Sequence, residues 1–233
     1  MSKAGKIVWK LIKAFFWLII FAVNVIMLWR VLFSGDPSEI KPILVNEQTL
    51  SAYEKVGDEL RLEVQMQRTI TESGRFSVTD CVFIPEAEQI QITVRYNNST
   101  LRKLVEDFGL ESLPDRKEEL FDVTLVKTVD LTPENSEDNT IKSTLREERY
   151  YPSAEPKTAY KTLYSYRKFI FDDVTYQDAV GMFVDIYYVG DKDYTETPYD
   201  ALCIYDALMD IEARELSGAD KRALKKASAL LEN

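Results

Sequence analysis

The feature that most constrains this chain is an uncharged apolar stretch of sixteen residues near its N-terminus, residues 14–29. The apolar run extends over residues 11–33 if Lys13 and Arg30 direct their charged ends toward lipid headgroups. A helix of that length, 23 residues, is ~34 Å long at ~1.5 Å per residue, which covers a hydrocarbon core of ~30 Å. The stretch therefore predicts a transmembrane helix.

Four residues characterise this predicted membrane anchor: Ala14, Trp17, Asn24 and Trp29. Trp29 and the earlier Trp9 fall near the two ends, where amphipathic rings favour the membrane interface. Asn24 falls in the middle of the membrane, where its amide could hydrogen-bond across a helix dimer and so support a homo-oligomer. A single amide is also tolerated in isolated membrane helices, so both interpretations stay open.

The flanking charges predict how the anchor is oriented. A cleaved secretory signal peptide also has a basic segment before an apolar run, but residues 32–37 contain no small-x-small cleavage pattern. We therefore favour an uncleaved signal anchor over a signal peptide or a buried core helix. Four lysines precede the helix and one arginine follows it, so the positive-inside rule places the N-terminus in the cytoplasm. We expect a single-pass plasma-membrane protein with an extracytoplasmic C-terminal domain.

The charge balance separates the anchor from the rest of the chain. The first 35 residues contain five bases and no acid, and the whole chain has a net charge of −10, so the remainder carries −10 − 5 = −15. Such an acidic domain repels phosphate backbones, which argues against nucleic acid as the partner of the folded part. We expect contact with the lipid bilayer through the N-terminal helix. About 200 residues remain for one main domain.

Beyond the anchor, the pattern of apolar residues predicts a mainly-β domain. Leu60, Leu62, Val64 and Met66 alternate with polar residues, which is typical of a strand with one wet face. Further strands are predicted at residues 75–84, 90–96, 121–129, 141–150, 162–171, 182–189 and 201–205. Turn and loop residues separate these strands, so we expect an antiparallel sandwich that is immunoglobulin-like in a loose architectural sense.

Helical patterns complete the predicted organisation. A short helix is inserted after the third strand, at residues 101–108, and a brief one is expected at residues 47–56. The chain ends in two predicted helices, residues 207–216 and 219–231, joined at a turn where Ser217 and Asp220 resemble a capping box. The expected division of the chain is residues 1–33 for the cytoplasmic stub and anchor, 34–58 for a stalk and short helix, 59–206 for the sandwich, and 207–233 for a helical tail.

Several kinds of chemistry are excluded or left without support. The chain contains no histidine, which removes Ser-His-Asp and Cys-His arrangements and histidine-containing zinc sites. Its eight scattered glycines form no nucleotide-binding loop, so we expect no cofactor.

Two Ser-x-x-Lys patterns occur, but Ser165 and Lys168 should face opposite sides of a strand. The second pair, Ser38 with Lys41, lies in a stalk without a pocket. Two acidic stretches, residues 134–138 and 191–193, do not match a calcium-binding loop, so no metal is expected.

The chain has two cysteines, Cys81 and Cys203, on an early and a late predicted strand. On an oxidising side of the membrane they could form a disulfide, because strands distant in sequence become neighbours in a sandwich. Two separate buried thiols are the alternative.

The last predicted helix differs in charge from the acidic domain before it. Lys221, Arg222 and Lys225 lie beside a narrow apolar stripe that includes Leu224 and Leu231. We expect this helix either to dock on its own domain or to engage an acidic partner or anionic lipid.

These observations favour a non-catalytic, membrane-tethered binding or assembly module that meets another envelope protein or polymer. The alternative is a hydrolase of cell-surface material that uses carboxylates such as Asp185 or Asp206 from separate strands. A concave pocket with two inward carboxylates would favour the hydrolase, and a flat tyrosine-rich face would favour the binding module.

Overall fold

The computed structural model describes residues 3–29, 37–66, 69–115, 120–131, 145–189, 197–206 and 209–231. The helices are α1 (Lys3–Trp29), α2 (Glu47–Val56), α3 (Asn98–Asp107) and α4 (Gly218–Leu231), with short 3-10 turns at Gly57–Glu59 and Pro85–Ala87. The strands are β1 (Leu62–Gln65), β2 (Thr69–Ile70), β3 (Phe76–Ile84), β4 (Gln89–Asn97), β5 (Phe121–Asp130), β6 (Leu145–Tyr150), β7 (Lys157–Tyr160), β8 (Tyr164–Phe171), β9 (Ala179–Tyr188), β10 (Asp200–Asp206) and β11 (Ile211–Arg214).

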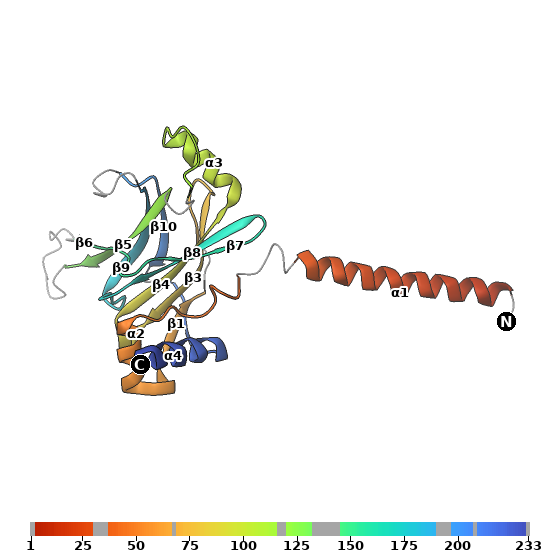
Figure 1. Cartoon of the computed structure of the whole chain (residues 1–233), viewed down its shortest axis with the longest axis horizontal. Coiled ribbons are helices and arrows are strands. Elements are labelled where there is room, and N and C mark those ends of the chain that lie inside the picture. Colours follow the sequence, from red (N-terminus) through yellow and green to blue (C-terminus); the bar gives the residue numbers. More distant parts are fainter. Residues whose placement is uncertain are drawn as a thin grey trace, which may run out of the picture.

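The strands form two antiparallel sheets (Figure 1). Sheet A has seven strands in the order β11-β1-β3-β4-β8-β7, with β2 paired to β3. Sheet B has four strands in the order β10-β9-β5-β6. An N-terminal apolar helix, two antiparallel sheets, an inserted helix after β4 and a C-terminal helix are therefore all present, as the sequence predicts.

The two sheets enclose one shared hydrophobic core. Alternate residues of β3, β4 and β8 face β5, β9 and β10, because side chains alternate between the two faces of a strand. The ring of Phe121 on β5 lies edge-on to Phe76 on β3 and to Tyr96 on β4, each with ring centroids 5.0 Å apart. These contacts fix sheet B against the inner face of sheet A.

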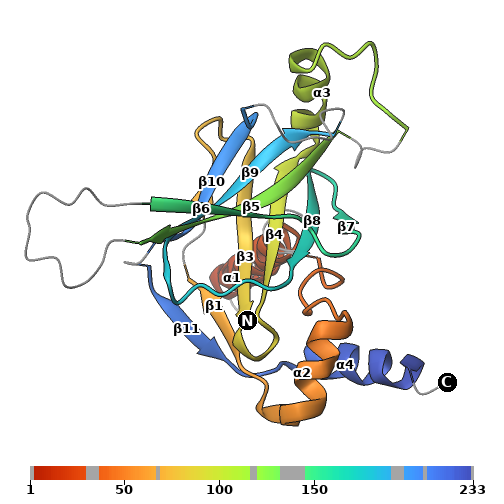
Figure 2. The ribbon, with the colours of Figure 1, turned by 90° about the vertical axis from the view of Figure 1, so that its left-hand side faces the viewer.

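A second hydrophobic cluster covers the outer face of sheet A. Strand β3 is apolar on both faces, so Val82 and Ile84 point away from the shared core. They pack with Ile43, with Leu216 and with Leu224 of α4. Sheet A is therefore covered on both sides, and α2 and α4 lie together against its outer face (Figure 2).

The C-terminal region departs from the predicted pair of helices. Residues 211–214 form strand β11, which pairs with β1 from Leu62 opposite Arg214 to Gln65 opposite Ile211. The expected helix over residues 207–216 is therefore wrong at these positions, because pairing with the exposed edge of β1 outweighs local helical preference. Only the second helix, α4, is present, and it begins at the predicted capping box: Ser217 N donates to Asp220 Oδ2 (2.9 Å) and Asp220 N donates to Ser217 Oγ (3.2 Å).

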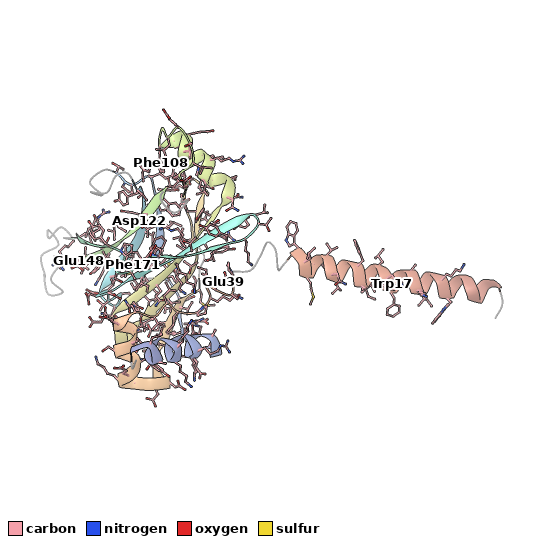
Figure 3. The ribbon with its side chains drawn as sticks, viewed as in Figure 1. Trp17, Glu39, Phe108, Asp122, Glu148 and Phe171 are labelled. Carbon is pink, nitrogen blue, oxygen red and sulfur yellow. The ribbon has the colours of Figure 1, made fainter. Side chains whose placement is uncertain are left out.

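Helix α1 is long and apolar enough to cross a membrane. Its stretch Ile12–Trp29 has a mean hydropathy of 2.2, and none of that stretch is buried against the described parts of the chain. Figure 3 shows Trp17 projecting from this helix well away from the folded domain.

Candidate functional site

Residues 37–46, here called the strap, lead into helix α2 and lie along the outer face of sheet A. Ile40 of the strap is buried against Ala159 on β7 and Tyr166 on β8. At the end of the strap, Asn46 caps α2 by accepting a hydrogen bond from Thr49 N (3.0 Å). The strap is thus packed on the folded domain. The sequence predicted a stalk and a short helix for residues 34–58, and the short helix is present as α2.

A fully buried lysine holds the first half of the strap. The ammonium of Lys168 on β8 donates to the carbonyl oxygens of Ile40 (3.3 Å) and Pro42 (3.1 Å) and to Asp80 Oδ2 on β3 (3.3 Å). Its side chain is 0% exposed. Burial lowers the pKa of Lys168, and the carboxylate of Asp80 opposes that shift. Three acceptors satisfy the three protons of the ammonium, so this lysine fastens the strap to two strands.

Two further side chains bind the strap backbone. The amide of Gln91 on β4 accepts from Leu44 N (2.8 Å) and donates to Leu44 O (2.7 Å), as a neighbouring strand would. Asp220 of α4 is fully buried and accepts from Ile43 N (2.8 Å). The strap is therefore bound at consecutive positions by side chains from β8, β4 and α4.

The chain enters the domain on the sheet A side, which leaves the outer face of sheet B on the opposite side. In Figure 3, Glu39 of the strap lies toward α1, whereas Asp122 and Glu148 of sheet B lie on the far side. Figure 2 looks onto sheet B, with α1 behind the domain. The outer face of sheet B is thus the face directed away from the tether.

A compact polar cluster lies on this outer face of sheet B. Arg149 on β6 donates to Thr124 Oγ1 on β5 (3.0 Å) and to the hydroxyl of Tyr187 on β9, and it forms an ion pair with Asp185 (3.3 Å). Its guanidinium carbon lies 5.6 Å from the centre of the Tyr187 ring, within the range of a cation–π contact. Three strands thus contribute to one cluster.

Asp185 belongs to this cluster, but Asp206 does not. In the β9–β10 ladder Asp185 is opposite Ala201 and Asp206 is opposite Gly181, so four residues of β9 separate the two positions. At ~3.3 Å per residue the separation is about 13 Å. Burial raises the pKa of Asp185, while Arg149 and Tyr187 act in the opposite direction. The structure therefore does not bring together the two carboxylates that the hydrolase alternative named.

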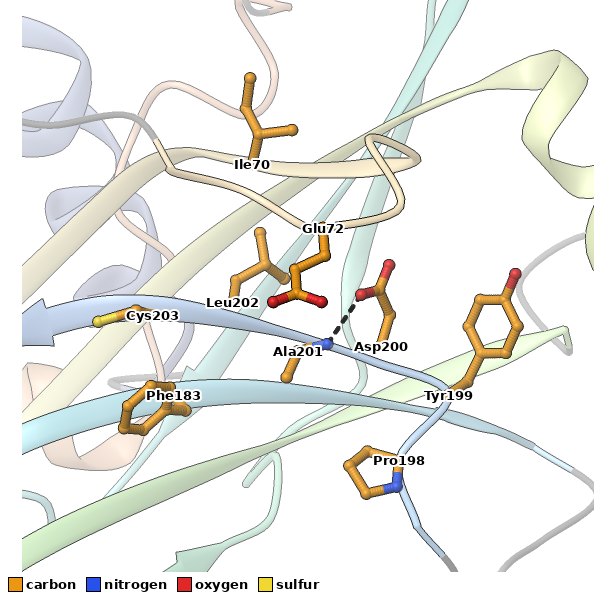
Figure 4. A pocket seen from close by; sticks show the side chains of 9 residues that line it. All are labelled: Ile70, Glu72, Phe183, Pro198, Tyr199, Asp200, Ala201, Leu202 and Cys203. Carbon is orange, nitrogen blue, oxygen red and sulfur yellow. Dashed lines mark hydrogen bonds between the residues drawn. The ribbon is translucent and has the colours of Figure 1, made fainter.

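A groove of about 540 Å³ lies between β10 and the hairpin that joins β2 to β3 (Figure 4). Phe183 and Leu202 give it an apolar wall, and Glu72 and Asp200 supply carboxylates from its two sides. Asp200 accepts a hydrogen bond from Ser73 Oγ (2.5 Å). The remaining lining residues are Ile70, Pro198, Tyr199, Ala201 and Cys203.

The predicted anchor residues all lie on α1, with exposed side chains. Asn24 donates from Nδ2 to the carbonyl oxygen of Ile20, one turn earlier, at 2.7 Å. Part of its hydrogen-bonding capacity is therefore met within its own helix.

The two cysteines are free thiols in this structure. Cys81 on β3 points into the shared core, where burial raises its pKa. Cys203 lies on β10, opposite Phe183 of β9. Its neighbours Leu202 and Ile204 point into the core, so Cys203 points to the other face of sheet B. The two thiols thus occupy different sides of sheet B, and this arrangement does not contain the disulfide that the sequence left open.

The charged C-terminal helix lies against its own domain. Leu224 of α4 is fully buried in the second hydrophobic cluster. Lys221 donates to Asp58 at 2.9 Å, whereas Arg222 and Lys225 are exposed. Leu231 is the last residue of the helix.

The remaining candidate sites from the sequence are the Ser165–Lys168 pattern and the two acidic stretches. Ser165 donates to Asn98 Oδ1 (2.5 Å), whereas Lys168 binds the strap, so the members of this Ser-x-x-Lys pattern have different partners. Both acidic stretches considered for calcium, residues 134–138 and 191–193, lie outside the described residues. Within the described ranges, no group of three or more acidic or cysteine residues is placed to hold a metal ion.

No protein-family model, curated protein or solved structure matches this chain. The described residues therefore define it in structural terms only: an apolar helix long enough to cross a membrane, joined to a domain of two antiparallel sheets.

Sequence reasoning named Lys168, Asp220 and Asp185 but missed the role of the first two in fastening the strap, and it missed Gln91 and the other members of the Arg149 cluster. One signal was available, because Gln89, Gln91 and Thr93 alternate with apolar residues along β4. That alternation predicts a face lined with polar side chains, but it does not distinguish a face in contact with water from one covered by another segment. All three side chains are buried.

Proposed function

We propose that this chain is a membrane-tethered, non-catalytic binding or assembly module that acts at the extracytoplasmic side of the plasma membrane. The observation that carries the proposal is the join between helix and domain. Helix α1 is apolar over Ile12–Trp29 and unburied, and the strap that begins at residue 37 is fixed to sheet A by Lys168 and Gln91 and to α4 by Asp220. Such a join suits a domain that must be held at a membrane in a defined orientation.

The position of sheet B supports a binding role for this domain. Its outer face lies away from the strap, so a membrane-bound chain would present it to an envelope protein or polymer. The groove beside β10 opens at the border of the same sheet, and Phe183 is 39% exposed there. In this proposal the domain is a sandwich, immunoglobulin-like in the loose sense, with the N-terminus of the chain in the cytoplasm. A homo-oligomer formed through α1 remains compatible with it.

The groove also gives the hydrolase alternative a specific location. Glu72, in the turn between β2 and β3, and Asp200 on β10 both line the groove, and a pair of carboxylates at one site is what a carboxylate-based hydrolase uses. If that alternative holds, Glu72→Gln and Asp200→Asn each abolish release of soluble fragments from purified cell-envelope polymer. Fragment release that is the same in both variants as in the unaltered chain, or that is absent from the unaltered chain, excludes it.

The tether and its orientation are tested in intact cells that express the full chain with an N-terminal tag. We expect added protease to degrade the domain beyond residue 37 while the tag stays protected until lysis. Protection of the domain in intact cells contradicts the proposed orientation. Release of a soluble chain that begins near residue 34 shows a cleaved signal peptide instead.

Binding is tested in the same cells with a photo-crosslinking amino acid at Phe183. The matched control position is Leu113, which is 38% exposed and follows α3. We expect a discrete crosslinked species of reproducible mass from position 183 and none from position 113. Absence of an adduct at position 183 in cells with a correctly oriented chain argues against a partner at this face.

A further inference from the structure

The strap limits how far the folded domain can lie from the end of the membrane helix. Helix α1 ends at Trp29, and the buried Pro37, eight residues later, begins the strap. A chain spans at most ~3.6 Å per residue, so Pro37 lies within about 29 Å of the end of α1 whatever path the chain takes. If α1 spans the bilayer, the part of the domain beside Pro37 is therefore held within reach of the bilayer surface.

That part of the domain is the hairpin formed by β7 and β8. Ile40 N donates to Pro37 O (3.0 Å), and Ile40 packs against Ala159 on β7 and Tyr166 on β8. In Figure 1 the hairpin extends from the domain on the side of α1. The start of the strap and this hairpin thus form one surface.

The tip of the hairpin carries apolar side chains in solvent. Tyr160 is 51% exposed and Leu163 is 43% exposed. The tip is also held in place: Lys161 N donates to Tyr164 O (2.8 Å), and Asn98 Nδ2 donates to the carbonyl oxygens of Lys161 and Thr162 (3.2 Å each). The backbone of the tip is therefore held in one conformation, from which the side chains of Tyr160 and Leu163 project.

The charge around the tip is opposite to that of the domain. Lys157 and Lys161 flank Tyr160, and Lys41 is exposed in the strap. Glu39 and Glu155 are the acids close to them in sequence. The chain beyond residue 35 carries −15 in total, so most of its surface is repelled by anionic lipid, whereas this surface has an excess of lysine.

We propose that the tip of the β7–β8 hairpin is a second membrane-contact site, which binds the interface of a bilayer that contains anionic lipid. Tyr160 and Leu163 enter the headgroup level, and Lys157 and Lys161 pair with anionic headgroups. The inference rests on the proposed tether, because α1 must already hold the domain at the bilayer. Two contacts, helix and hairpin, then fix the tilt of the domain and direct sheet B away from the membrane.

The experiment uses the full chain in lipid nanodiscs, with a fluorescent probe on Leu163→Cys in a Cys203→Ser background. Cys81 is buried in the core, so the probe reacts at one position. Val180→Cys in the same background is the control, because Val180 is 41% exposed and lies on β9 of sheet B. Collisional quenching by lipids spin-labelled near the headgroup is compared between phosphatidylglycerol-containing and pure phosphatidylcholine discs.

We expect strong quenching at position 163 and weak quenching at position 180 in the anionic discs. Removal of phosphatidylglycerol should reduce quenching at position 163. Lys157→Gln and Lys161→Gln should each lower the ratio of docked to undocked domain roughly fivefold, which corresponds to about 1 kcal/mol per lysine near an anionic surface.

Equal quenching at the two positions overturns the inference, as does quenching at position 163 that is unaffected by phosphatidylglycerol. In either case the chain remains in the nanodisc, so the proposed tether stands. A chain that does not co-purify with nanodiscs overturns the tether and this inference together.

Discussion

At the scale of single residues, Lys168 connects the strap to two strands through one buried ammonium. Lys168→Met keeps much of the side-chain length but leaves two carbonyl oxygens and the carboxylate of Asp80 without their donor. We expect the free energy of unfolding to fall by about 3 kcal/mol, because removing one partner of a buried ion pair leaves the other uncompensated. Urea denaturation of the full chain in detergent measures this.

Lys157 provides the matched control, since it lies directly opposite Lys168 in the β7–β8 ladder and its side chain is exposed. In detergent, Lys157→Met should change the free energy of unfolding by less than about 0.5 kcal/mol. Similar losses in the two variants would show that Lys168 has no special role in holding the strap.

Asp185 makes stability depend on pH in a predictable direction. Burial raises its pKa above the ordinary value of 3.8, so the folded state keeps this proton to a higher pH than the unfolded state does. Folding is therefore linked to proton binding, and the contribution of Asp185 to stability falls as pH rises from 3.8 through the folded-state pKa. Asp185→Asn should remove this fall, measured as the difference between the two chains in free energy of unfolding across acidic pH. A difference of opposite slope would mean that Arg149 outweighs burial.

At the scale of secondary-structure elements, α4 joins the domain through one of its leucines and leaves another in solvent. Leu224 is fully buried, whereas Leu230 on the same helix is 71% exposed. Leu224→Ala should lower the free energy of unfolding by about 2–5 kcal/mol, because it leaves a cavity in the cluster under the helix. Leu230→Ala should change it by less than about 0.5 kcal/mol. Equal effects in thermal unfolding would mean that α4 does not dock as described.

Elements with a strong pattern could be predicted from the sequence, whereas short elements without such a pattern could not. Strands β3, β4, β5, β8 and β9 show long apolar runs or alternation, and the helix α3 shows a helical period. Strands β7 and β11 have four residues each and owe their form to pairing with β8 and β1. No local pattern records such a partner, so residues 211–214 were expected to be helical.

The candidate sites were less accessible to prediction than the strands. Lys168 was visible only as part of a three-residue coincidence with Ser165, since its partners in the strap are more than 120 residues earlier. The Arg149 cluster depends on the order of β9, β5 and β6 in sheet B. A single sequence indicates which strands exist, but not which strands become neighbours.

At the scale of the whole molecule, the folded unit begins with the strap rather than with helix α2. A chain that starts at residue 37 keeps every partner of Lys168, Gln91 and Asp220, and we expect it to fold as it does behind α1. A chain that starts at residue 47 loses the five hydrogen bonds that these side chains make to the strap and the burial of Ile40 and Ile43. At about 0.5–1.5 kcal/mol per hydrogen bond, this loss is comparable with the total stability of a domain. Circular dichroism melting of the two chains should show a cooperative transition only in the longer one. Cooperative melting of both at the same temperature contradicts this role of the strap.

The same attachment determines where a mechanical load on the tether would enter the domain. Within the described domain, tension applied through α1 first reaches Ile40, Pro42, Ile43 and Leu44 of the strap, and these are held by β8, α4 and β4. The strap lies along the sheet, so its bonds would be strained side by side in shear rather than opened one after another. A pull on the anchor would thus be shared between one sheet and one helix rather than concentrated on a single strand.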